Sequence, residues 1–152
     1  MKVFLDTNII LDVLLERAPF ARSAKLLLLL AAVGEMDACC GASQLTDVYY
    51  LLRRHDTTVP CERTVKQLKA FREQIQICSL TEDDVDRALD SGWKDFEDAC
   101  IYSMADRVGA DYLITRDRDD FEGSLIKVVD CDGFFNDLAD QGIVYEEIEL
   151  EG

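Results

Sequence analysis

The sequence predicts a single α/β domain with a mainly parallel central sheet and helices on both faces of that sheet. Short apolar runs, typical of core strands, alternate along the chain with longer segments whose apolar residues recur at helical spacing. This alternation indicates parallel strands joined by right-handed helical crossovers. The length of 152 residues suits one domain, and the chain contains no linker, internal repeat or low-complexity tract.

The first part of the chain is expected to contain two strands and three helices. The strands span residues 2–5 and 37–40, and the helices span residues 9–16, 21–33 and 44–54. Pro19 separates the first two helices, and Gly34 ends the second because glycine readily adopts the backbone conformation of a helix C-terminus. Ser43 is the expected N-cap of the third helix.

The same alternation continues through the rest of the chain. The expected strands span residues 75–80, 112–115 and 126–129, and the expected helices span 62–73, 82–89, 95–108 and 134–139. Thr81 and the acidic residues after it favour a helix start, and Gly109 closes the helix that precedes the next strand. We assign residues 1–140 to the domain and residues 141–152 to an acidic tail, for which an edge strand and a frayed end are both open.

The composition limits the classes of function. The 31 Asp and Glu residues against 16 Lys and Arg give a net charge of −15, which excludes general electrostatic capture of nucleic acid. A phosphate-bearing substrate therefore needs a cation as mediator. The longest apolar run, residues 26–33, is too short to span a membrane and no secretory signal is recognisable, so we expect a cytoplasmic protein without membrane contact. The six cysteines are expected to be reduced thiols packed in the core, because they show neither C-x-x-C pairs nor zinc-ligand spacing.

Acidic side chains are expected to gather at one edge of the sheet. All strands of a parallel sheet end at the same edge, and the following helices begin there. Five acids occupy such strand ends or early helical positions: Asp6, Asp47, Asp95, Asp98 and Asp117. Carboxylates brought together raise one another's pKa unless a hard cation lies between them, and Mg²⁺ or Mn²⁺ is the natural occupant.

Most other acids need no functional role, since acidic residues are so frequent that chance spacings are common. We interpret Asp83, Asp84, Asp86 and Glu97 as solvated charges or as first-turn charges favoured by the helix dipole. Asp6 differs from these. An acid placed directly after a core strand carries a desolvation cost that a purely structural residue usually avoids.

Four short blocks carry a resemblance to a known family. They are Val3-Phe4-Leu5-Asp6-Thr7-Asn8, Ser43-Gln44-Leu45-Thr46-Asp47, Asp95-Phe96-Glu97-Asp98-Ala99, and Leu113-Ile114-Thr115-Arg116-Asp117 with Asp120-Phe121. In their order and spacing, from residue 2 to about residue 138, the chain resembles the PIN domain family, in particular stand-alone bacterial proteins similar to VapC-type toxins. The resemblance implies a three-layer α/β/α fold, a metal-dependent endoribonuclease activity and an acidic cluster that binds Mg²⁺ or Mn²⁺.

The resemblance also implies roles for individual residues. Asp6, Asp98 and Asp117 match the first, third and fourth acids of the family and are expected to bind metal. Asp47 matches the second, where toxin-type members usually carry Glu, so direct and water-bridged contact are both open for its shorter side chain. Asp95 is a further metal candidate. The supporting positions are Thr7, Asn8, Thr115 and Asp120, of which Asp120 is equally well explained as a turn cap.

The mechanism expected from these residues is hydrolysis of an RNA phosphodiester. One or two ions held by the four family acids would activate a water molecule and neutralise the transition state, so no protein nucleophile is required. No G-x-S-x-G motif occurs, and His55 is interpreted as a solvated helix end rather than a general base. Arg116, Arg118 and Lys94 are the basic residues nearest the expected site, where they would contact flanking phosphates or pair with neighbouring acids.

Two alternatives to a nuclease stay open. A catalytically silent PIN-like interaction module would bind a basic protein partner, and the apolar segment 49–52 is either its contact surface or a helix buried on two sides. A haloacid-dehalogenase-like phosphatase is disfavoured, because Asn8 stands where its second acid belongs. Retention of an acid at all four family positions favours the nuclease. The resemblance further suggests the toxin of a toxin–antitoxin pair, with an antitoxin and a second copy of the chain as partners.

Overall fold

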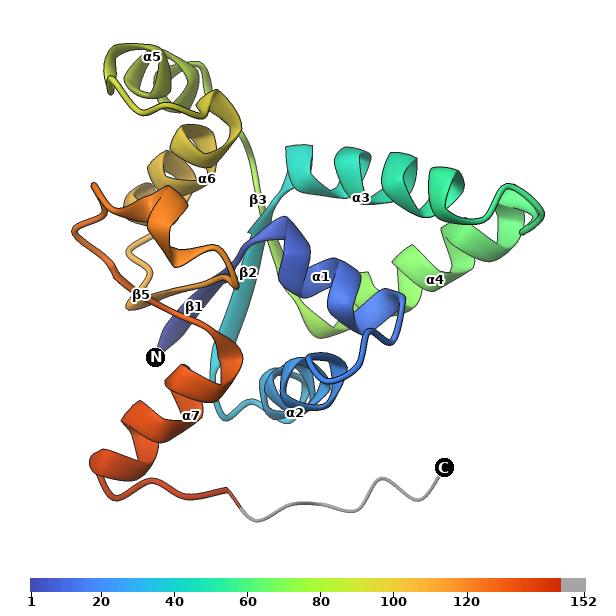
Figure 1. The fold of residues 1–152 in the computed structure, drawn as a ribbon, viewed down its shortest axis with the longest axis horizontal. Helices are drawn as coiled ribbons and strands as arrows, with labels where there is room; N and C mark the ends of the chain where they lie inside the picture. The colour runs from blue at the N-terminus through green and yellow to red at the C-terminus, as the bar shows by residue number, and fades with distance from the viewer. Residues whose placement is uncertain (146–152) are drawn as a thin grey trace.

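The central sheet determines which residues share one edge. The structure, a computed structural model, describes residues 1–145, and its strands form one parallel sheet in the order β3-β2-β1-β4-β5 (Figure 1). The strands are β1 (Lys2–Leu5), β2 (Asp37–Gly41), β3 (Gln76–Cys78), β4 (Tyr112–Ile114) and β5 (Lys127–Val129). The expected parallel sheet is therefore confirmed, although β3, β4 and β5 are each shorter than predicted.

Helices cover both faces of the sheet and complete the predicted three-layer arrangement. They are α1 (Thr7–Leu14), α2 (Ala21–Ala32), α3 (Ala42–His55), α4 (Cys61–Gln74), α5 (Glu82–Asp90), α6 (Phe96–Arg107), α7 (Cys131–Asp140) and a 3₁₀ helix, η1 (Arg118–Phe121). Alternate residues of a strand point to opposite faces. Val3 and Leu5 therefore join the core with α1, α2, α3, α4 and α7, whereas Phe4 joins the core with α6 and η1.

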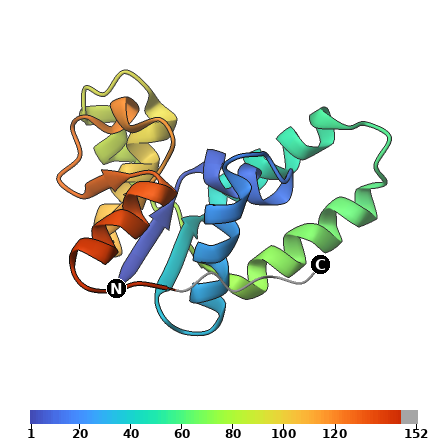
Figure 2. The ribbon, with the colours of Figure 1, turned by 60° about the horizontal axis from the view of Figure 1, so that its bottom comes forward.

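The outer helices extend in two directions from this core. Figure 2 shows the α3–α4 hairpin projecting on one side and the α5–α6 pair lying on the other. Helix α3 buries Gln44, Val48 and Leu52 on one face, but Tyr50 and Leu51 are 58% and 40% exposed. Burial of α3 on two sides, one of the two interpretations of segment 49–52, is therefore wrong.

The start of α3 differs from the prediction because of one buried side chain. Ser43 is not the N-cap; the helix begins at Ala42, and Ser43 lies inside its first turn. The Gln44 Oε1 atom accepts a hydrogen bond of 2.7 Å from the Gly41 backbone N–H, so a side chain within the helix satisfies the backbone at its start. Glycine at position 41 also leaves room for Met104, since a Cβ there would lie 2.4 Å from the Met104 methyl carbon.

Helix α7 also begins earlier than predicted. Asp130 directly follows β5, and its side chain accepts a hydrogen bond of 2.7 Å from the Gly133 N–H. This cap starts the helix at Cys131 instead of residue 134. The prediction of an edge strand or a frayed end concerns a tail of which residues 146–152 lie outside the described part of the chain.

The six cysteines are free, as expected, and most of them pack in the interior. Cys39, Cys40, Cys100 and Cys131 are buried and Cys78 is half-buried, whereas Cys61 at the start of α4 is exposed, so its predicted place in the core is wrong. Across residues 1–145, no helix has the length and apolar character that crossing a membrane would require.

Candidate active site

The candidate site lies where the strand order of the sheet reverses. Strands β1 and β4 are neighbours, while the chain winds outward from β1 to β2 and β3 on one side and from β4 to β5 on the other. A crevice opens at such a point beyond the carboxyl ends of the strands. The Asp6 N–H donates to the Ile114 carbonyl at 2.9 Å, so the residues that follow β1 and β4 are held side by side.

Asp6 is a buried acid held by two hydrogen bonds. Its side chain is the N-cap of α1: Oδ1 accepts from the Thr7 N–H at 2.7 Å, and Oδ2 accepts from the Thr115 hydroxyl at 2.7 Å. Burial raises the pKa of Asp6, the two hydrogen bonds oppose this, and the charges of Asp117 and Asp120 raise it further. Within residues 1–145 no ion pair to Asp6 is present.

The Thr115 hydroxyl connects both strand ends. Besides donating to Asp6, its oxygen accepts from the Asn8 side-chain amide at 3.3 Å and from the Asp117 N–H at 3.0 Å. Asn8 also donates to Asp117 Oδ2 at 3.1 Å. One hydroxyl hydrogen and two lone pairs are thus all used, which fixes the orientation of Asp6, Asn8 and Asp117 relative to one another.

The first turn of α6 brings a second group of acids to the same edge. Asp95 is the N-cap of this helix, and its Oδ1 atom accepts from the Asp98 N–H at 3.0 Å. Partial burial and the charges of Asp95, Asp6, Asp120 and Glu97 together raise the pKa of Asp98 to about 7. The neighbours named here extend from the end of β1 to η1, so the acids converge from different elements of the fold.

Glu97 is exposed in the first turn of α6, as predicted, and its charge also interacts with the acids of this edge. Partial burial raises its pKa, and the charges of Asp47, Asp6 and Asp95 raise it further. Glu97 therefore links the exposed Asp47 of α3 to the acids of α6. The local sequence favours a helix-dipole role for any acid in this turn, and the influence of Asp47 and Asp6, which lie outside α6, does not follow from it.

The donor set fits a hard divalent cation. All the side chains that the site offers to an ion are carboxylates, hydroxyls or amides, whose oxygen atoms are the ligands that Mg²⁺ and Mn²⁺ prefer. Burial, and after it the charges of neighbouring acids, raise the pKa values of Asp6, Glu97 and Asp98. In the described residues, no three His, Cys, Asp or Glu side chains are spaced as a formed coordination shell. The acids lie at one edge of the sheet, but their side chains do not surround a single point.

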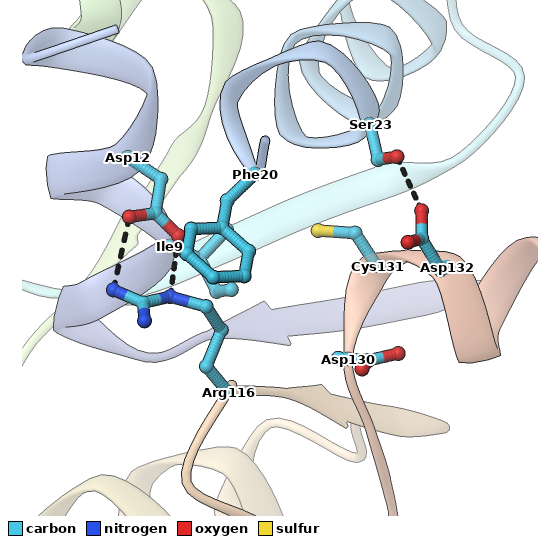
Figure 3. Close-up of a pocket in the computed structure, with 8 residues that line it drawn as sticks. All are labelled: Ile9, Asp12, Phe20, Ser23, Arg116, Asp130, Cys131 and Asp132. Carbon is cyan, nitrogen blue, oxygen red and sulfur yellow. Dashed lines mark hydrogen bonds and ion pairs between the residues drawn. The ribbon is translucent and has the colours of Figure 1, made fainter. Parts of the chain in front are cut away.

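The structure places Arg116 differently from the expected phosphate contact. Its guanidinium is turned toward α1, where Nε and NH2 donate to the two carboxylate oxygens of Asp12 at 2.8 and 3.1 Å (Figure 3). The alternative expectation for Arg116 was pairing with a neighbouring acid, and the structure shows this pairing. Arg118 and Lys94 are exposed, as a phosphate contact requires.

Two residues that the sequence did not single out support the site from inside. Asp12 is fully buried, and its only signal in the sequence is a charge among the apolar positions of α1. Gln44 is buried as well; its Nε2 atom donates to the Leu5 carbonyl at 2.8 Å and to the Thr7 hydroxyl at 3.3 Å. Gln44 thereby joins the start of α3 to the end of β1. No local pattern reveals either contact.

A family comparison identifies this arrangement. The sequence model described as the PIN domain matches residues 2–119, more than half of the chain. The chain belongs to the PIN domain family. The resemblance carried by the four sequence blocks is thus confirmed, and the strand ends and helix starts described above are the edge at which the acids of this PIN domain gather.

Individual relatives agree with this assignment. The chain is 24% identical over 122 residues to ribonuclease VapC1 of Aquifex aeolicus (strain VF5), a match that covers 77% of this chain and 82% of that protein. Its fold is similar to that of VapC20 of Mycobacterium tuberculosis, described as a sarcin-ricin loop cleaving toxin, with a TM-score of 0.64 at 18% identity over 83% of this chain and 98% of that one. The VapBC2 structure of Rickettsia felis, bound to a promoter DNA fragment, gives a TM-score of 0.64 at 17% identity over 86% and 98% of the chains. These likenesses confirm the PIN-type three-layer fold.

Proposed function

We propose that this PIN domain protein is a metal-dependent endoribonuclease that hydrolyses RNA phosphodiester bonds. The observation that carries the proposal is the group of acids at the shared ends of β1 and β4. Asp6 and Asp98 have raised pKa values there. Their ionised forms are therefore less stable in the folded protein than in water, and a bound cation would stabilise them. Relatives described as a ribonuclease and as an RNA-loop cleaving toxin support RNA as the substrate.

Asp6, Asp98 and Asp117 are the residues that would hold the ion, with Asp95 and Asp47 beside them. A bound Mg²⁺ or Mn²⁺ would activate a water molecule and stabilise the charge of the phosphodiester transition state. The chain's own residues prepare for this. Thr7 and Thr115 keep the Asp6 carboxylate oriented through hydrogen bonds of 2.7 Å each.

Other residues would position the fourth acid and the substrate. Asn8 orients Asp117 through its hydrogen bond of 3.1 Å. Asp120 adds to the negative charge around Asp6 and Asp98. We propose that the exposed Arg118 and Lys94 contact flanking RNA phosphates, because Arg118 directly follows Asp117 and Lys94 directly precedes Asp95. We place the reaction in the cytoplasm, where RNA and free Mg²⁺ meet.

The partners belong to the same proposal. Relatives solved as toxin–antitoxin assemblies support an antitoxin that regulates this nuclease. Tyr50 and Leu51 on the exposed face of α3 offer apolar area for such a partner or for a second copy of the chain. The same face would serve a catalytically silent interaction module, but a silent module gives no reason for uncompensated acids at the sheet edge. Family membership leaves the phosphatase alternative without support.

The decisive experiment is RNA cleavage by the purified protein with Mg²⁺, Mn²⁺ or EDTA. Asp6→Asn is the test variant, because asparagine still caps α1 and accepts a hydrogen bond while the charge is lost. Asp86→Asn on the exposed face of α5 makes the same chemical change away from the site. We expect metal-dependent cleavage that Asp6→Asn abolishes and Asp86→Asn retains. A folded wild-type protein that cuts no RNA with either metal would refute the nuclease.

A further inference from the structure

The pocket beside the candidate site is built around an ion pair that crosses the fold. Asp12 of α1 is fully buried, and Arg116, in the loop after β4, donates two hydrogen bonds of 2.8 and 3.1 Å to its carboxylate (Figure 3). The Arg17 guanidinium lies 3.7 Å from the same carboxylate. A buried carboxylate with a two-pronged arginine partner holds that partner in one orientation.

Arg116 is also held by contacts outside this ion pair. Its guanidinium carbon lies 4.1 Å from the centroid of the Phe20 ring, directly before α2. Its backbone N–H is 3.4 Å from Asn8 Oδ1, to which it donates. The side chain, the guanidinium face and the backbone of Arg116 are therefore each fixed by a different residue.

The contacts to Asn8 and Asp12 come from one face of one helix. These two residues are four apart in α1 and so lie above one another on its surface. Asp12 binds the side chain of Arg116, and Asn8 binds the Arg116 backbone and the Asp117 carboxylate. Helix α1, which Asp6 caps, thus contacts the loop of residues 115–117 at two positions about one helical turn apart.

We propose that Arg116 is a positioning residue, which through Asp12 holds residues 115–117 so that Thr115 and Asp117 face Asp6. This inference rests on the proposed function, because it makes Arg116 act through the metal-binding acids instead of on RNA phosphate. Its local consequence, an ordered 115–117 loop in metal-free protein, is independent of catalysis.

The fold contains a matched pair that serves as a control. Asp84 of α5 is fully buried, and the Arg107 Nε atom lies 3.1 Å from each of its carboxylate oxygens. The side chains of Arg107 and Arg116 are 35% and 28% exposed, so the two pairs have similar burial. Arg107, however, joins α5 to α6 and donates to the Ser79 carbonyl after β3, and within residues 1–145 none of its hydrogen bonds reaches the residues that follow β1 and β4.

Lysine at either position keeps the positive charge but loses the planar, two-pronged geometry. We expect Arg116→Lys to accelerate amide hydrogen exchange of residues 115–121 in metal-free protein and to weaken Mn²⁺ binding, measured by calorimetry, by about 10–100-fold, as for groups that orient metal ligands. Arg107→Lys should leave both measurements unchanged. Asp12→Asn, compared with Asp84→Asn, repeats the test from the acidic side if Arg116→Lys does not fold.

Three outcomes would overturn the inference. Unchanged exchange and Mn²⁺ affinity in Arg116→Lys, with a higher KM for RNA, would make Arg116 a phosphate contact. Equal weakening by Arg116→Lys and Arg107→Lys would reduce the effect to a general loss of stability. If wild type binds no Mn²⁺ and cuts no RNA, the proposed nuclease fails, and unaltered exchange in Arg116→Lys would then refute the positioning role separately.

Discussion

Asp84 and Asp98 occupy the same position in two neighbouring helices and yet are opposite in their electrostatics. Each is the third residue of its helix, and each donates its backbone N–H to the capping side chain, Thr81 in α5 and Asp95 in α6. Burial alone would raise the pKa of Asp84, but hydrogen bonds from Arg107 and Thr81 lower it. Burial and four neighbouring acids raise the pKa of Asp98 to about 7.

The comparison separates two uses of a carboxylate in one fold. Asp84 is paired with the Arg107 guanidinium and joins α5 to α6, whereas the charges that shift the pKa of Asp98 are all acidic, which makes Asp98 a candidate for binding a cation from solution. Asp84 is fully buried and Asp98 only half-buried, but the presence of an arginine beside Asp84, and not helix position, gives the two pKa shifts their opposite directions.

The largest expected effect comes from exchanging these two acids for asparagine. Asp98→Asn should lower RNA cleavage by on the order of 10²–10³-fold, as for loss of a preorganised charge-stabilising group. It should also stabilise the metal-free protein, because repulsion among the acids decreases. Asp84→Asn should do the reverse. Its unfolding free energy should fall by about 2 kcal/mol, because the charged hydrogen bonds of Asp84 are lost, and its Mn²⁺ affinity should not change. Urea denaturation and calorimetry on both variants measure these quantities, and a matching loss of stability in both would remove the distinction.

Part of this site could be predicted from the sequence because it follows from topology. The rule that parallel strands end together was enough to bring Asp6, Thr115 and Asp117 to one edge. The Asp12–Arg116 pair could not be predicted, since its partners are 104 residues apart and nothing in either local pattern refers to the other. Glu97 is the first-turn acid that its local pattern predicts, but the influence of Asp47 and Asp6 on its pKa comes from other elements, which the pattern of α6 does not contain.

The fold shows the same division between local and tertiary signals. Strand and helix order followed from the apolar pattern alone. The starts of α3 and α7 did not, because each depends on a side chain that reaches the backbone at the helix N-terminus: Gln44 for α3 and Asp130 for α7. A capping residue of the usual type close by, Ser43, drew the predicted start of α3 two residues too far along the chain.

A smaller effect is expected on the pH dependence of stability. The pKa of Asp98 is raised from an ordinary value of 3.8 to about 7, so the folded protein binds more protons than the unfolded chain between these values. Unfolding free energy of the metal-free protein should therefore fall as pH rises through this range. The pKa of Asp84 is lowered, so its contribution is present above its ordinary value and is lost at more acidic pH.

Urea denaturation in EDTA at several pH values from 4.5 to 7.5 tests this sign. Wild-type protein should lose stability as pH rises, Asp98→Asn should show a smaller slope, and saturating Mn²⁺ should also reduce the slope because the ion keeps the carboxylate charged. An identical slope in wild type and Asp98→Asn would assign the pH dependence to other groups.

The smallest effect should come from Glu97→Gln. The charges of Asp47, Asp6 and Asp95 raise the pKa of Glu97, but Glu97 is not among the acids that we propose to hold the ion. Its substitution removes one negative charge near the ion and should weaken Mn²⁺ binding by roughly tenfold or less, the lower end for groups beside a metal shell. Asp86→Asn, an exposed acid on α5, is the control for a simple change of net charge. Calorimetry at fixed ionic strength compares the Mn²⁺ affinities of the two variants. Equal affinities would mean that Glu97 acts only as a solvated charge. A loss of affinity as large as that of Asp98→Asn would make Glu97 a direct metal ligand.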